Sequence, residues 1–127
     1  MLEILTILIY LIAIEHLGIM ALEMWGRPEQ QARAFGMPIT FVRQVPAQKA
    51  LANQGIYNGM LAVILILAQW LLPMPTSLIT TALLLGFIVI VALYGSLTVK
   101  RQIFWLQGVP ALVTLIILLS QLISRYP

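Results

Sequence analysis

Four long apolar stretches follow one another along the chain, and the short segments between them hold most of its charged residues. A helix needs about 20 mostly apolar residues to cross roughly 30 Å of hydrocarbon. The windows at about 2–25, 49–72, 77–99 and 103–124 meet this need. Because most of the connections are short, consecutive helices should be antiparallel neighbours. The pattern predicts an all-α polytopic membrane protein, with one antiparallel four-transmembrane-helix bundle formed by residues 1–127.

Composition supports a lipid environment for these stretches. Hydrophobic residues make up 61% of the chain and charged residues only 9%, whereas about 25% charged residues is ordinary for a soluble domain. A soluble domain of this size would need more polar side chains to cover its surface. The net charge of +3 does not indicate nucleic acid, because the basic residues form neither a dense run nor a face interleaved with aromatics. The lipid bilayer is therefore the expected partner.

The distribution of basic side chains predicts the orientation in the membrane. Cytoplasmic loops are enriched in Lys and Arg. Loop 26–48 with its edge, together with the turn between the last two spans, holds six of the seven basic residues: Arg27, Arg33, Arg43, Lys49, Lys100 and Arg101. The opposite side holds only Arg125. We therefore expect a multi-pass protein of the cell inner membrane, with loop 26–48 in the cytoplasm and both termini outside.

Loop 26–48 is the one long connection, and its sequence predicts a short helix. Proline is favoured at the first position of a helix and glycine just past its end. Pro28 and Gly36 fit these two positions, so a surface helix should run from Pro28 to Phe35.

The first span carries ionisable residues, which are costly inside a bilayer and are usually functional there. Glu15, His16 and Glu23 fall within an arc of about 100° on a helix. If chemistry occurs, Glu15 and His16 are the expected acid–base pair, and Glu23 is expected to bind ligand. Glu23 alone also suits a structural role, reaching lipid headgroups or pairing with Arg27 four residues on. No metal site is expected, because one histidine with carboxylates offers few ligands and no HExxH spacing exists.

The other spans carry uncharged polar residues in their predicted cytoplasmic halves. The second span has a polar face and, opposite to it, a GxxxG pattern at Gly55 and Gly59 that lets helix backbones approach closely. In the fourth span Pro110 should produce a kink. If the polar faces converge, they form a pocket open to the cytoplasm. Each residue taken singly would also suit a purely structural role, a hydrogen bond between neighbouring helices. The expected ligand-binding residues, besides Glu23, are Asn53, Gln54, Tyr57, Asn58, Tyr94, Thr98 and Gln107.

Four segments resemble motifs of a bacterial membrane-protein family known as domain of unknown function 1304. They are AIEHLGIMALEMW at 13–25, LANQGIYNG at 51–59, YGSLT at 94–98 and QGVPA at 107–111. The resemblance covers nearly the whole chain. It implies a compact four-helix protein of the bacterial inner membrane and brings no known activity with it.

Three functions are consistent with these features. The leading hypothesis is a cytoplasm-facing intramembrane pocket that binds a small amphipathic or lipid-like ligand, with chemical transformation of that ligand as its extension. The second is proton-coupled transport, by analogy with small multidrug exporters, which would require Glu15 to be accessible from both sides and the chain to form a homodimer. The third is a non-catalytic assembly or partner protein that uses the basic loop. The sequence does not indicate a cofactor.

Overall fold

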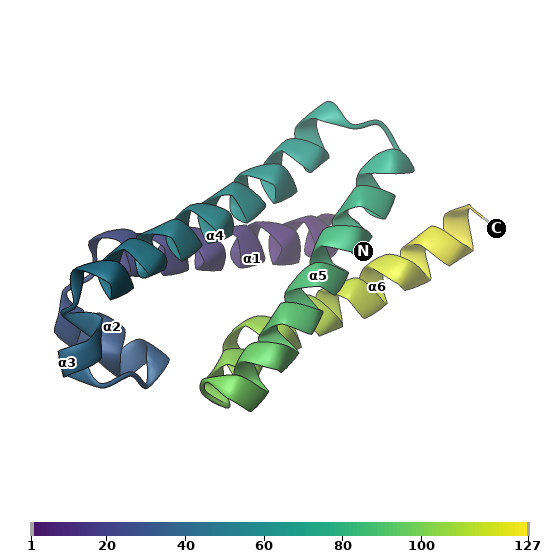
Figure 1. Ribbon diagram of the computed structural model, residues 1–127. Helices are drawn as coiled ribbons and strands as arrows, with labels where there is room; N and C mark the ends of the chain where they lie inside the picture. The colour runs from purple at the N-terminus through teal and green to yellow at the C-terminus, as the bar shows by residue number, and fades with distance from the viewer. Residues whose placement is uncertain (1, 127) are drawn as a thin grey trace.

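The structure, a computed structural model, describes residues 2–126, which are mostly helical and contain no strand. The long helices are α1 (Leu2–Trp25), α4 (Val45–Leu71), α5 (Thr76–Thr98) and α6 (Val109–Arg125), the last preceded by a π-helical turn, η1 (Phe104–Gly108) (Figure 1). Four segments are long and apolar enough to cross a membrane. The predicted fold class, an all-α protein with four membrane-spanning helices, is therefore confirmed.

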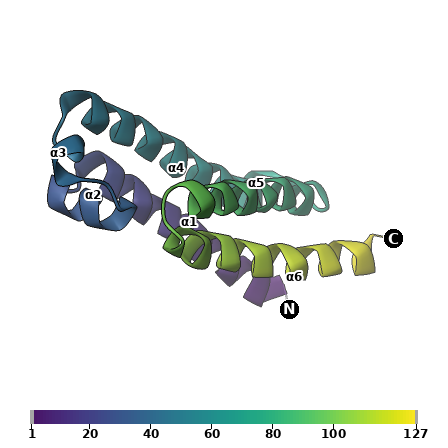
Figure 2. The same cartoon turned by 60° about the horizontal axis from the view of Figure 1, so that its bottom comes forward.

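The four long helices form two antiparallel pairs, α1 with α4 and α5 with α6 (Figures 1 and 2). Within the first pair, Gly55 and Gly59 of α4 lie against Met20 and Met24 of α1. A Cβ atom built on Gly55 would lie only 2.6 Å from Cγ of Met24. The glycines thus let the two backbones approach closely, which is the packing role that the GxxxG pattern predicted.

Two short helices lie between α1 and α4. Helix α2 (Pro28–Phe35) has the predicted bounds, with Pro28 in its first turn and Gly36 closing it in the left-handed conformation at φ 64°. Helix α3 (Ile39–Val42) was not predicted. Helix α4 begins four residues earlier than expected, because Pro46 falls in its first turn, where the missing amide hydrogen is not needed.

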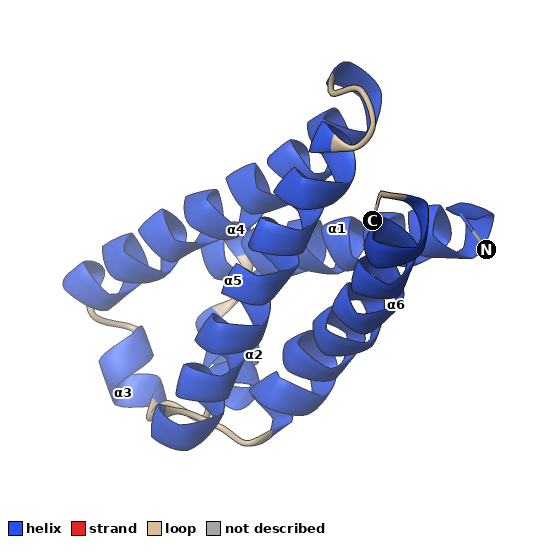
Figure 3. Cartoon of the chain, turned by 90° about the vertical axis from the view of Figure 1, so that its right-hand side faces the viewer, coloured by secondary structure: helices blue, strands red, loops and turns tan. Residues whose placement is uncertain are grey.

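The two basic segments meet at one end of the molecule. Nζ of Lys100, in the turn after α5, donates a hydrogen bond to the backbone carbonyl of Arg33 in α2 over 2.9 Å. Figure 3 shows α2, α3 and this turn at the lower end of the molecule, away from both termini. The shared position of these segments is the arrangement that the positive-inside prediction requires.

The half of the bundle farther from the basic segments is filled by apolar side chains from all four long helices. The central members are almost completely buried: Leu5, Ile9, Ile12, Leu65, Leu78, Leu85 and Leu118. Polar contacts brace the same half, since Gln69 donates to Thr81 over 2.7 Å and the Trp70 ring nitrogen donates to the Tyr10 hydroxyl over 2.6 Å. This half is a packed core.

The fourth span departs from the sequence prediction at its start. The N–H of Val109 donates to the carbonyl of Phe104, five residues back, so one π-helical turn precedes α6. Pro110 lies in the first turn of α6. The irregularity expected at Pro110 takes the form of this π-helical turn directly before it, because a proline inside a continuous helix lacks the amide hydrogen and its ring crowds the carbonyl four residues back.

Candidate functional site

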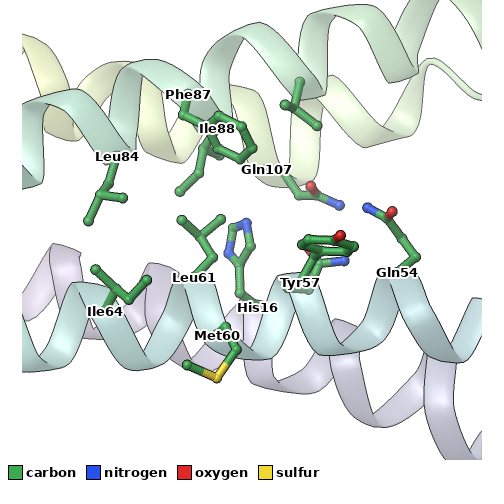
Figure 4. Close-up of a pocket in the computed structure, with 12 residues that line it drawn as sticks. His16, Gln54, Tyr57, Met60, Leu61, Ile64, Leu84, Phe87, Ile88 and Gln107 are labelled. Atoms are coloured by element: carbon green, nitrogen blue, oxygen red, sulfur yellow. The ribbon is translucent and has the colours of Figure 1, made fainter.

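A pocket of about 270 Å³ lies between α1 and α4 on one side and α5 and η1 on the other. Figure 4 shows the ring of His16 rising between Leu61 and Tyr57, with Ile88 facing it from α5. Most of the lining is apolar. The polar members are His16, Gln54, Tyr57, Asn58 and Gln107.

His16 is buried, with 1% of its surface exposed, but within residues 2–126 only one of its ring nitrogens has a hydrogen-bond partner. Nδ1 lies 2.9 Å from the carbonyl of Ile12, one turn back on α1. A carbonyl oxygen only accepts hydrogen bonds, so Nδ1 must carry a hydrogen, and Nε2 of the neutral ring is then an acceptor. Nε2 has no hydrogen-bond partner among residues 2–126. In the same residues, every side-chain nitrogen or oxygen that is completely shielded from solvent does have a partner. Nε2 must therefore be reachable from the pocket.

Two further hollows adjoin this pocket. The second, of about 240 Å³, shares Gln54, Asn58 and Gln107 with the first and adds Glu23. The third, of about 300 Å³, contains Glu15 and shares Phe35 and Gln107 with the second. Because neighbouring hollows have lining residues in common, we treat the three together as one groove. Gln107, in the π-helical turn, lines all three hollows.

Glu23 is held by a residue of α4. Nδ2 of Asn58 donates to Oε2 of Glu23 over 2.7 Å, and Glu23 is only 6% exposed. No ion pair with Arg27 is formed within residues 2–126. The structural alternative for Glu23, pairing with Arg27 or reaching headgroups, is therefore replaced by a contact across the α1–α4 interface.

Glu15 and His16 face different parts of the groove. Successive residues on a helix point about 100° apart, and here Glu15 lines the third hollow while His16 lines the first. Along the described residues no hydrogen bond joins the two side chains. Their joint action as an acid–base pair remains a prediction.

Three of the expected ligand-binding residues lie away from the groove. Asn53, Tyr94 and Thr98 are exposed and line none of the three hollows. The hydroxyl of Thr98 donates to the carbonyl of Tyr94, within its own helix. Asn53 stands at the edge of the polar arc of α4, about 100° from Gln54, so the rotation of α4 that turns Gln54 to the groove turns Asn53 away.

The structure also adds a buried polar residue that sequence reasoning missed. Gln31 of α2 is 0% exposed, and its Nε2 donates to the carbonyls of Leu22 and Glu23, each over 3.0 Å. Its Oε1 accepts from Nε2 of Gln48 over 2.7 Å. Gln31 thereby fixes the end of α1 that carries Glu23. A glutamine in a polar loop gave no signal, because its burial depends on how the loop folds back.

The surface segment carries one ion pair outside the membrane-spanning helices. Arg43 of the α3–α4 junction lies 2.7 Å from Oε1 of Glu29, and both side chains are exposed. This contact lowers the pKa of the Glu29 carboxyl below its ordinary value. One of the arginines of the basic loop is thus neutralised locally by an acid of the same loop.

Comparison with known proteins places the chain among relatives. The model of a family described as a protein of unknown function, DUF1304, matches residues 10–119. The chain belongs to this family. It is also 37% identical over 115 residues to "Uncharacterized protein YpaA" of Lactococcus lactis subsp. lactis (strain IL1403), an alignment that covers 89% of this chain and 95% of the relative. No solved structure matches the chain. The DUF1304 assignment confirms the resemblance seen in the sequence motifs.

Proposed function

We propose that this member of DUF1304 is an inner-membrane protein that binds a small amphipathic, lipid-like ligand in the groove. The observation that carries the proposal is His16, a buried side chain that presents a free acceptor nitrogen to an otherwise mostly apolar pocket. Pockets for small molecules are typically apolar cavities with a few placed polar groups. The amides of Gln54, Asn58 and Gln107 supply such groups beside His16.

The charge distribution supports a groove that opens towards the cytoplasm. Its second and third hollows are lined by Phe35 of α2, the helix whose carbonyl at Arg33 binds Lys100. These are the segments that the positive-inside rule assigns to the cytoplasm, with both termini outside. The opposite half of the bundle is packed with apolar side chains, which favours ligand binding from one side over transport across the membrane.

Two neighbouring leucines of α5 provide a matched test. Leu84 lines the pocket, whereas Leu83 is 71% exposed on the outer face of the same helix. Leu84→Trp should fill the pocket, while Leu83→Trp adds the same bulk on the side that faces lipid. Each variant would be purified in detergent, and small molecules released by solvent extraction would be measured by mass spectrometry.

The expected result is a molecule, present at about one per chain in the wild type and in Leu83→Trp, that is depleted in Leu84→Trp. Thermal unfolding of both variants would show that each is folded. Equal amounts in the two variants, or nothing bound in the wild type beyond bulk phospholipid, would refute the proposal.

A further inference from the structure

The charged residues that line the groove are acidic. Among the described residues that line its three hollows, the charged side chains are Glu15 and Glu23, and neither Lys nor Arg is present. Glu15, Ile19 and Glu23 follow one another at one-turn intervals along the groove-facing side of α1. An anionic head placed there would meet like charge with no counter-ion, and like charges in contact are disfavoured.

Four basic side chains from the same end of the molecule make other contacts or line another hollow. Lys100 donates to the carbonyl of Arg33, and Arg43 pairs with Glu29. Arg27 and Arg33 line a separate hollow on the surface of α2, together with Glu29. Within residues 2–126 no salt bridge joins Glu15 or Glu23 to a Lys or Arg side chain.

The groups that do line the groove favour a hydrogen-bond donor and a cation. Glu15 makes no side-chain hydrogen bond within residues 2–126, and Glu23 has its contact at Oε2 with Asn58. Nε2 of His16 is the free acceptor in the first hollow. The aromatic rings of Phe35, Tyr57 and Phe87 also line the groove, and aromatic faces attract cations.

The remaining wall suits an alkyl chain. Leu61, Ile64, Leu84 and Ile88 line the first hollow, which joins the acidic part of the groove through Gln54, Asn58 and Gln107. A ligand that satisfies both parts has a compact polar head and an apolar tail.

We infer that the groove takes a cationic amphiphile, an alkylamine whose ammonium head lies in the acidic part of the groove between Glu15 and Glu23 and whose tail lies among the apolar side chains of the first hollow. This inference rests on the proposed ligand-binding function and specifies the charge of the ligand's head. It follows from the complementarity between an unpaired acidic lining and a positive head group.

A series of ligands with one tail and different heads tests this inference. Dodecylamine, 1-dodecanol and dodecanoate would be titrated into the purified chain in uncharged maltoside micelles at about pH 8, where the amine is protonated and the alkanoate ionised. Concentration-dependent thermal stabilisation gives the apparent dissociation constants. We expect dodecylamine to bind at least about tenfold more tightly than dodecanoate, with dodecanol in between.

Charge-neutralising variants then locate the preference. The double variant Glu15→Gln with Glu23→Gln should bring amine and alkanoate close to parity, whereas Glu3→Gln, which removes an exposed acid from the same helix, should leave the preference intact. If the double variant does not fold, Glu15→Gln alone decides, because Glu15 has no side-chain hydrogen bond to lose in the described structure.

Equal affinity for amine and alkanoate in the wild type would overturn the inference, as would a preference that survives Glu15→Gln and the double variant. If all three ligands bound equally well and Leu84→Trp abolished their binding, the cationic head would be refuted but the ligand groove would stand. Failure of all three ligands to bind would refute both the inference and the proposed function.

Discussion

A side chain added at Gly55 should separate α1 from α4, and the structure sets the size of the effect. A Cβ atom at this position would lie 2.6 Å from Cγ of Met24 and 3.2 Å from both Cβ of Glu23 and the carbonyl oxygen of Met20. The Met24 side chain is flexible and can move, but the Met20 carbonyl belongs to the backbone. Gly55→Ala therefore forces a small displacement of α1, and Gly55→Val a larger one.

Overpacking of a well-packed interface typically destabilises by about 1–3 kcal/mol. We expect Gly55→Ala near the lower end of that range and Gly55→Val near the upper end. The matched control is Gly86 of α5, where an added Cβ meets nothing within 4 Å. Replacing glycine in a helix interior also changes intrinsic helix propensity by up to about 1 kcal/mol, and subtracting the Gly86 result from the Gly55 result removes this contribution.

The free energy of unfolding would be measured by titrating purified variants from a mild detergent into sodium dodecyl sulfate, with helix content followed by circular dichroism. The expected order of stability is Gly86→Ala above Gly55→Ala, and Gly55→Ala above Gly55→Val. If Gly55→Ala and Gly86→Ala differed by less than about 0.5 kcal/mol, the scatter expected at surface sites, the close approach of the two backbones would not be what holds α1 to α4.

Three further predictions concern the segment between α1 and α4 and the orientation of the bundle. Gln31→Leu removes the side-chain donor to the carbonyls of Leu22 and Glu23, of which the Leu22 carbonyl keeps the N–H of Gly26, and should destabilise by about 1–3 kcal/mol, measured by the same titration. Arg43→Ala should raise the pKa of Glu29 towards its ordinary value, since their contact lowers it, as followed by carboxyl NMR. The small stabilisation from that exposed pair is present above the ordinary pKa of 4.5 and is lost as pH falls through the lowered pKa. Lys100→Cys should react with an impermeant maleimide from the cytoplasm and Thr76→Cys from outside; reaction of both from one side would overturn the topology.

The elements that could be predicted from the sequence are those defined locally. The four spans were identified because an apolar stretch of sufficient length is visible without knowledge of the fold. The bounds of α2 followed from Pro28 and Gly36, each of which acts on its own backbone. The packing role of Gly55 and Gly59 was also correct, because absence of a side chain is a property of the residue itself.

The groove was only partly predictable, since it depends on helix rotation and crossing. Gln54 and Asn53 are neighbours on α4, yet only Gln54 lines the groove. Glu23 was expected to bind ligand, with headgroups or Arg27 as its structural alternative, and its hydrogen-bond partner Asn58 lies 35 residues away in sequence. In the sequence of α5, the apolar residues that line the groove cannot be distinguished from apolar residues on the opposite face of the helix. These features depend on long-range packing, which periodicity within one helix does not determine.

The π-helical turn η1 has a consequence for how the groove can vary among sequences. A π-helical turn accommodates one more residue than the corresponding α-helical turn, and here it places Gln107 on all three hollows. Because the wider turn absorbs this extra residue, deleting a single residue from 104–108 would restore regular α-helical geometry and leave the flanking residues on their present faces. The packing of α6 after Pro110 would stay in register. A change of one residue in this turn would therefore alter which side chain lines the groove without disturbing the packed core.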